Sequence, residues 1–167
     1  MPRSFDVSVE SSVSVEQVHA AFGEPDYWLA RFAAFGGNKT LDSLDISPDG
    51  TVTVVVSEDL RRGALPGFLA RVYRGDLNIV STEVWAPVVD GQVRGQVAIA
   101  VTGAPGSGRG DAVLAPSDTG SRLSFAGFVQ FQVPLVGGTI ESFVAREFVQ
   151  GIPKIQRFTN TWVGEHA

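Results

Sequence analysis

Residues 123–162 read LSFAGFVQFQVPLVGGTIESFVAREFVQGIPKIQRFTNTW, and within them the spacing of apolar side chains changes from every second residue to every third or fourth. Before the proline, Leu123, Phe125 and Val129 alternate with polar or small residues, which is typical of a strand with one buried face. After the double glycine, apolar residues recur with helical spacing as far as Trp162. The stretch therefore predicts a last strand followed by a long C-terminal helix.

The predicted helix has one broad apolar face. Its members are Ile140, Val144, Phe148, Ile155, Phe158 and Trp162, with Phe143 and Ile152 at the flanks. A face this rich in large apolar residues needs a wide surface to cover it, so we expect the helix to lie across the concave side of a sheet.

The N-terminal residues predict one strand and two short helices. Phe5, Val7 and Val9 alternate with polar residues and indicate the strand. Ser14 followed by Gln17 has the spacing of a capping box at the start of the first helix. An aromatic-rich segment that ends in a double glycine suits the second.

From residue 39 to residue 133, apolar residues recur at every second position, and this pattern predicts six strands. Four turn signals separate or interrupt them, with the sequences SPDG, VDG, APGSGRG and SDTG at residues 47–50, 89–91, 104–110 and 117–120. We expect the third of these to be a flexible turn, because its glycines match neither a Walker motif nor a dinucleotide fingerprint.

This order of elements resembles the helix-grip fold of the START-like (SRPBCC) superfamily, which includes polyketide cyclase-like and lipid-transfer proteins. The run VPLVGGTIE at residues 133–141, with Trp85 at the end of the fourth strand, is similar to the bacterial domain-of-unknown-function family 2505. The resemblance covers the whole chain. It implies an α+β fold in which a curved seven-stranded antiparallel sheet wraps a long C-terminal helix, with a hydrophobic ligand between them. We expect residues 1–167 to form one such domain.

The composition argues against several partners. Eighteen acidic and thirteen basic residues leave a net charge of −5, which opposes binding to nucleic acids and to anionic membranes. The first residues lack the apolar core of a signal peptide, and no run reaches the roughly 20 apolar residues that span a bilayer. We therefore expect a cytoplasmic monomer or homodimer without nucleic acid and without integral membrane association.

The sequence predicts no catalytic residue, no metal site and no cofactor. The absence of cysteine excludes a thiolate nucleophile and a cysteine-ligated metal. The two histidines, His19 and His166, are far apart in sequence and have no predicted partners. For His19 we expect a surface position on an amphipathic helix.

The candidate ligand site consists of side chains expected between the helix and the sheet, most of them apolar. They are Trp28, Phe32, Phe68, Glu83, Trp85, Ile99, Phe125, Phe131, Phe143, Glu147, Phe148 and Ile152. Phe68 lies in residues 61–74, a segment too long for a hairpin turn, which we interpret as a flap over the site.

Two of these candidates are charged. Glu83 alternates in phase with Ile79 and Trp85, which would direct it into the cavity, but the opposite set of residues on this strand is also apolar and would turn it to solvent. Glu147 lies at the margin of the helix face near Lys154. We expect its side chain to extend to water, and we consider contact with a ligand the less favoured interpretation.

The function we expect is non-catalytic binding or transport of an apolar, lipid-like or polyketide-like molecule. Two alternatives stay open. One is a cyclase or hydratase in which a buried carboxylate such as Glu83 is the general acid or base. The other is a protein-interaction module with a filled core and an exposed apolar patch.

Overall fold

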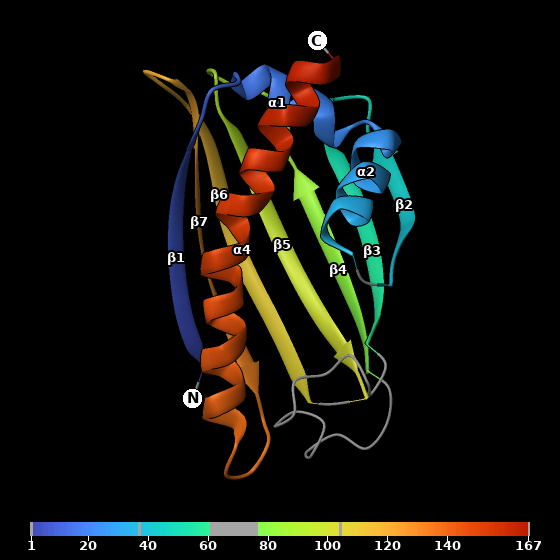
Figure 1. Cartoon of the computed structure of the whole chain (residues 1–167), viewed down its shortest axis with the longest axis vertical. Helices are drawn as coiled ribbons and strands as arrows, with labels where there is room; N and C mark the ends of the chain where they lie inside the picture. The colour runs from blue at the N-terminus through green and yellow to red at the C-terminus, as the bar shows by residue number, and fades with distance from the viewer. Residues whose placement is uncertain (1, 37, 61–76, 104, 167) are drawn as a thin grey trace.

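The computed structural model describes residues 2–36, 38–60, 77–103 and 105–166. Within these ranges it contains one seven-stranded sheet and three helices, with the long C-terminal helix lying across the sheet (Figure 1). In chain order the elements are β1 (Arg3–Ser11), α1 (Val15–Phe22), α2 (Pro25–Phe35), β2 (Lys39–Ile46), β3 (Val52–Leu60), β4 (Leu77–Trp85), β5 (Val93–Thr102), β6 (Gly106–Ser117), β7 (Gly120–Phe131) and α4 (Gly137–His166). The predicted order of elements is confirmed.

The strands lie side by side in the order β1-β7-β6-β5-β4-β3-β2, and every neighbouring pair is antiparallel. Successive strands from β2 to β7 are therefore neighbours, and β1 pairs with the last strand, β7. Helix α4 packs against β1 and β7, whereas α2 packs against β2 at the other edge. The two helices thus lie on the same face of the sheet and leave its middle strands between them (Figure 1).

Helix α1 begins at the predicted capping box. The Ser14 hydroxyl accepts a hydrogen bond from the Gln17 backbone N–H at 3.1 Å, and the Gln17 side chain accepts one from the Ser14 backbone N–H at 2.9 Å. These two bonds satisfy donors that a helix start leaves free. The helix buries its apolar face, consisting of Val15, Val18, Ala21 and Phe22.

An aromatic cluster fills the space between α4 and the sheet at the end of the molecule where α1 lies (Figure 1). The Tyr27 hydroxyl is 2.6 Å from the Thr159 hydroxyl of α4, and the Trp28 indole N–H donates to the Phe22 carbonyl at 2.8 Å. The rings of Phe22 and Trp85 are 4.6 Å apart. The buried hydroxyls and the indole N–H are therefore hydrogen-bonded, as a stable aromatic core requires.

The flexible turn expected at residues 104–110 is largely wrong, because β6 begins at Gly106. Its glycines do not supply turn conformations. A Cβ atom at Gly106 would come within 2.4 Å of the Phe131 ring, and one at Gly110 within 2.5 Å of the Phe125 ring. The aromatic rings of β7 lie directly on the backbone of β6, so these strand positions exclude any side chain.

Helix α4 extends beyond both ends of the predicted helix, and one side of it is buried and partly polar. Glu141, with an exposed fraction of 3%, accepts a hydrogen bond from the Phe131 backbone N–H at 2.9 Å. The Gln156 amide donates to the Ser11 hydroxyl at 3.1 Å. These bonds attach α4 to the end of β7 and to β1, and the apolar pattern alone did not predict them.

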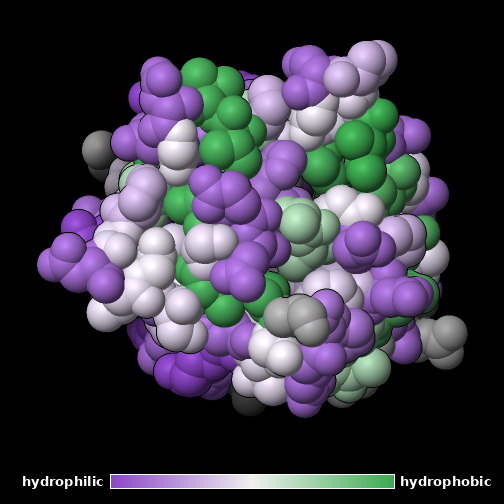
Figure 2. Space-filling model, turned by 90° about the horizontal axis from the view of Figure 1, so that it is seen from above, coloured by the Kyte–Doolittle hydropathy of each residue, from purple (hydrophilic) through white to green (hydrophobic). Residues whose placement is uncertain are grey.

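The surface seen from the end that carries α1 mixes hydrophobic and hydrophilic residues (Figure 2). The large apolar side chains that are most exposed come from separate elements, for example Leu29 of α2, Ile46 of β2 and Leu135 before α4. Scattered exposed apolar residues of this kind are normal for a folded domain. None of the helices in the described ranges is both long enough and apolar enough to cross a membrane.

Candidate functional site

A cavity of about 540 Å³ lies between the inner face of the sheet and helices α2 and α4. Strands β2 to β7 supply its floor, and the two helices supply its walls. The volume is within the range of roughly 300 to 1,000 Å³ that is typical of small-molecule sites. The aromatic cluster beside α1 fills the remaining space under α4, so the cavity occupies only part of the region that α4 covers.

Most of the side chains that line the cavity are apolar. The apolar ones are Trp28, Phe32, Val56, Leu77, Ile79, Val97, Ile99, Val101, Val129, Phe131, Ile140, Phe143, Val144, Phe148, Ile152 and Ile155. The polar ones are Arg31, Lys39, Glu58, Ser81, Glu83, Ser107 and Glu147, and the described lining also includes two glycines, Gly108 and Gly151. An apolar volume with a few polar groups can bury the body of a ligand and orient its polar end.

The apolar face predicted for the C-terminal helix divides between the cavity and the aromatic cluster. Val144 and Phe148 line the cavity and stay partly exposed. Phe158, farther along α4, packs against the Tyr27 ring with 5.9 Å between ring centroids. The first two-thirds of the apolar face are therefore available to a ligand, and the last third is part of the core.

Nine of the twelve candidate residues line this one cavity, as the structure places them. They are Trp28, Phe32, Glu83, Ile99, Phe131, Phe143, Glu147, Phe148 and Ile152. Trp85 and Phe125 do not line it, because their rings are buried against the backbone of Gly95 and Gly110. Phe68, with the segment interpreted as a flap, lies outside the residues that the structure describes.

Glu83 takes the inward of its two predicted orientations and lines the cavity from β4. Its Oε1 accepts a hydrogen bond of 3.1 Å from the indole N–H of Trp85, two residues away on the same face of the strand. The Trp85 ring is itself fixed by the aromatic cluster. The carboxylate is thus held at the boundary between the aromatic cluster and the cavity.

Of the other charged residues of the lining, Glu147 and Lys39 are exposed, whereas Glu58 and Arg31 are half-buried like Glu83. Glu147 lines the cavity but is exposed, as an edge residue of the helix would be, and Lys154 is exposed and outside the lining. Glu58 of β3 is the cross-strand neighbour of Lys39 on the edge strand β2. The Arg31 guanidinium of α2 lies 4.8 Å above the centre of a Trp28 ring, a cation–π distance.

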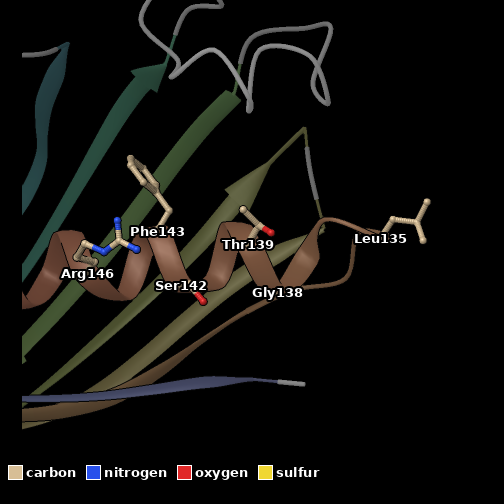
Figure 3. A pocket seen from close by; sticks show the side chains of 6 residues that line it. All are labelled: Leu135, Gly138, Thr139, Ser142, Phe143 and Arg146. Atoms are coloured by element: carbon tan, nitrogen blue, oxygen red, sulfur yellow. The ribbon is translucent and has the colours of Figure 1, made fainter.

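A second hollow, of about 530 Å³, lies beside the first turns of α4 (Figure 3). It is lined by Leu135, Gly138, Thr139, Ser142, Phe143 and Arg146. All of these residues belong to α4 or to the segment just before it, and Leu135 points away from the helix into solvent. Because all of its described lining residues come from this one segment of the chain, the hollow is a weaker candidate than the cavity under α4, which the sheet and two helices enclose.

Neither histidine lies in the cavity lining. His19 is half-buried, more than a surface position predicts, and its Nε2 has no hydrogen-bond partner in the part of the chain that the structure describes. His166 stacks on Trp162 with 4.1 Å between ring centroids. Across the described ranges, no three His, Asp or Glu side chains cluster closely enough to hold a metal ion.

The sequence analysis missed much of the cavity floor on β3 and β4. Ile79 and Ser81 line the cavity in the same phase as Glu83 and are every second residue of β4. If the side chain of Glu83 had been assigned to the inner face of β4, then Ile79 and Ser81 would have been assigned to it as well. The choice was ambiguous because Val80 and Val84, on the outer face of the strand, are also apolar.

Comparison with known proteins shows one family over nearly the whole chain. The family described as "Protein of unknown function (DUF2505)" matches residues 6–163. The uncharacterized protein Rv0481c of Mycobacterium tuberculosis is 38% identical over 170 residues, which cover 98% of each chain. The similarity therefore extends over nearly the whole of both chains.

Solved structures of low sequence identity share the fold. Ara h 8.0201 is similar with a TM-score of 0.55 and 12% identity over 99% of each chain. Norcoclaurine synthase from Thalictrum flavum, solved in complex with dopamine and hydroxybenzaldehyde, is similar with a TM-score of 0.52 and 12% identity, over 100% of this chain and 89% of that one. These likenesses confirm the helix-grip fold.

Proposed function

The chain belongs to the DUF2505 family and has the helix-grip fold, and on this basis we propose that it binds or carries a small apolar molecule in the cavity under α4. The observation that carries the proposal is the cavity itself. Sixteen of its lining residues are apolar, and they come from the sheet and from two helices. Burial of a ligand's apolar surface there stabilises the complex by about 25 cal/mol per Å².

The size of this volume supports a ligand site over a filled core. Side chains in ordinary cores pack to the density of organic crystals, and a space of this size lined by valine, isoleucine and phenylalanine loses many dispersion contacts. An apolar ligand restores those contacts. A norcoclaurine synthase of the same fold has been solved with two small aromatic molecules, which agrees with ligand binding but does not identify the ligand of this chain.

Native mass spectrometry tests the proposal on protein purified from its own host or from a lipid-rich expression host. We expect a stoichiometric adduct, which solvent extraction then releases for identification. An apo mass that stays unchanged after exposure to fatty acids, sterols, polyketides, alkyl alcohols and alkylamines would contradict the proposal. It would favour an interaction module instead.

A second candidate function is catalysis on the bound molecule, and one observation favours it. Glu83 places a carboxylate inside an apolar cavity and has its orientation fixed by Trp85. A positioned carboxylate of this kind can transfer protons as a general acid or base. If the chain is an enzyme, Glu83→Gln abolishes turnover of the extracted ligand while the ligand still binds.

We further propose that residues 1–167 act as one domain, as a monomer or homodimer, in the cytoplasm. The single sheet supports the first statement, since its first strand β1 pairs with its last strand β7 and α4 packs on both. Analytical ultracentrifugation and fractionation of the host cell test the other two.

A further inference from the structure

Among the residues that the structure describes, the lining of the cavity carries three carboxylates and two cations. Glu58, Glu83 and Glu147 line it, together with Arg31 and Lys39. Glu58 and Lys39 are directly opposite each other on β3 and β2, so they offset one charge of each sign. Among the described lining residues, two carboxylates and one guanidinium are then left.

Neither lining cation is paired with Glu83. Lys39 is exposed on the edge strand, opposite Glu58, and Glu58 is opposite Ile79 on β4. Glu83 is four residues from Ile79 along β4. At about 3.3 Å per residue, the two residues are about 13 Å apart along the strand. The Lys39 ammonium and the Glu83 carboxylate are therefore too far apart for an ion pair, which needs its N and O atoms within about 4 Å. Arg31 lies over the Trp28 ring.

Glu83 itself has unused capacity to accept hydrogen bonds. In the described part of the chain its one polar partner is the Trp85 indole N–H, which bonds Oε1. A carboxylate offers about four acceptor positions, so Oε2 stays available to a ligand. The cross-strand neighbours of Glu83 are Val54 and Val97, which leave it flanked by apolar side chains. In such surroundings a cation contributes more than it does in water.

Building on the proposed function, we propose that the ligand is an apolar molecule with a protonated amine and that Glu83 binds the amine. The indole N–H of Trp85 fixes one carboxylate oxygen, and the ammonium group donates to the other. Ser81, two residues earlier on the same face of β4, offers a hydroxyl as a further acceptor. The apolar part of the ligand then lies along the cavity between β4, β5 and α4. Anionic ligands such as fatty acids are disfavoured, because their carboxylates repel Glu83.

Three ligands with the same alkyl chain test this inference, namely decylamine, decanol and decanoate. Their dissociation constants are measured at pH 7 on the full chain by isothermal titration calorimetry, at ligand concentrations below micelle formation. We expect decylamine to bind at least tenfold more tightly than decanol and decanoate to bind most weakly. The measurement on the unaltered protein is informative by itself and does not depend on a variant folding.

Two variants locate the effect. Glu83→Gln keeps an oxygen that accepts the Trp85 N–H, so the cavity should stay intact while the charge is lost. We expect it to reduce the preference for amine over alcohol to within about twofold of unity and to leave the decanol affinity unchanged. Glu58→Gln is the matched control, because it removes a lining carboxylate that already faces Lys39. This variant should retain most of the preference.

The outcomes separate the two proposals. Equal affinity for decylamine and decanol overturns the amine inference and leaves ligand binding in place. An equal loss of preference in Glu58→Gln and Glu83→Gln overturns Glu83 as the amine site, because it shows a general effect of negative charge. If none of the ligands tested here or by native mass spectrometry binds, both proposals fail.

Discussion

Replacing Gly151 with leucine is the most direct way to fill the proposed binding volume. Gly151 lies on α4 in the cavity lining, and a Cβ atom built there meets nothing within 4 Å. Among the described residues, nothing therefore obstructs the first atom of a new side chain, and we expect the rest of it to extend into the cavity. Gly164, on the same helix, is an exposed glycine whose Cβ would also meet nothing within 4 Å, and it lies outside the lining. Gly164→Leu is the matched control.

The two substitutions should differ in stability by the burial of one leucine side chain. Both replace glycine by a good helix former, which contributes about 0.8 kcal/mol at each site. Full burial of a leucine contributes roughly 1.5 to 3 kcal/mol, and we take about half of this because the cavity is partly open. Gly151→Leu should then stabilise the ligand-free protein by about 2 kcal/mol and Gly164→Leu by about 0.8 kcal/mol. In a chain of this size these values correspond to rises in Tm of roughly 4 to 8 °C and 2 to 3 °C.

Ligand binding should change in the opposite direction. A leucine at residue 151 displaces about two methylene groups of ligand, each worth about 0.8 kcal/mol, so the affinity should fall roughly tenfold or more. Calorimetric titration of both variants with the extracted ligand measures this, and differential scanning calorimetry measures Tm. A Gly151→Leu protein that binds as tightly as the control would refute the reasoning, as would one that melts at a lower temperature than the unaltered chain.

Two further predictions concern stability. Glu141→Ala leaves the part-buried Phe131 backbone N–H without its acceptor and should cost about 1 to 3 kcal/mol in urea unfolding, whereas Glu141→Gln should cost much less. Equal losses in the two variants would contradict this role. Hydrogen bonds from Ser117 and Arg122 hold the pKa of Glu10 below its usual value of 4.5. The stability that Glu10 contributes is therefore present above about pH 4.5 and lost as pH falls through its lower folded-state pKa, so Glu10→Gln should flatten this part of the acid-unfolding profile.

The spacing of apolar residues and the residue types at turns were enough to predict most of the fold. The capping box at Ser14 and the change of period after residue 133 identified the first and last helices, because backbone geometry dictates both signals. The exception was β6. Glycines commonly mark turns, and nothing in the local sequence shows that Gly106 and Gly110 lie beneath the rings of Phe131 and Phe125 on another strand.

The candidate site was predicted less completely, because apolar periodicity does not distinguish a cavity wall from a core. Phe148 and Phe125 have the same type of pattern in the sequence, yet only Phe148 lines the cavity. Phe125 is buried because its ring lies over Gly110, a position of the neighbouring strand β6 that has no side chain. Glu83 was ambiguous for a related reason, since both faces of β4 are apolar enough to be buried.

The two sides of α4 make different contacts. Its polar buried side holds the helix to β1 and β7 through Gln156 and Glu141, while the side that carries Val144 and Gly151 borders empty volume. Because Gln156 and Glu141 make these bonds from the other side of the helix, substitutions at Val144 or Gly151 leave the bonds in place. A scaffold arranged in this way can acquire new specificities over evolutionary time, or under directed selection, through substitutions that leave its anchoring bonds untouched.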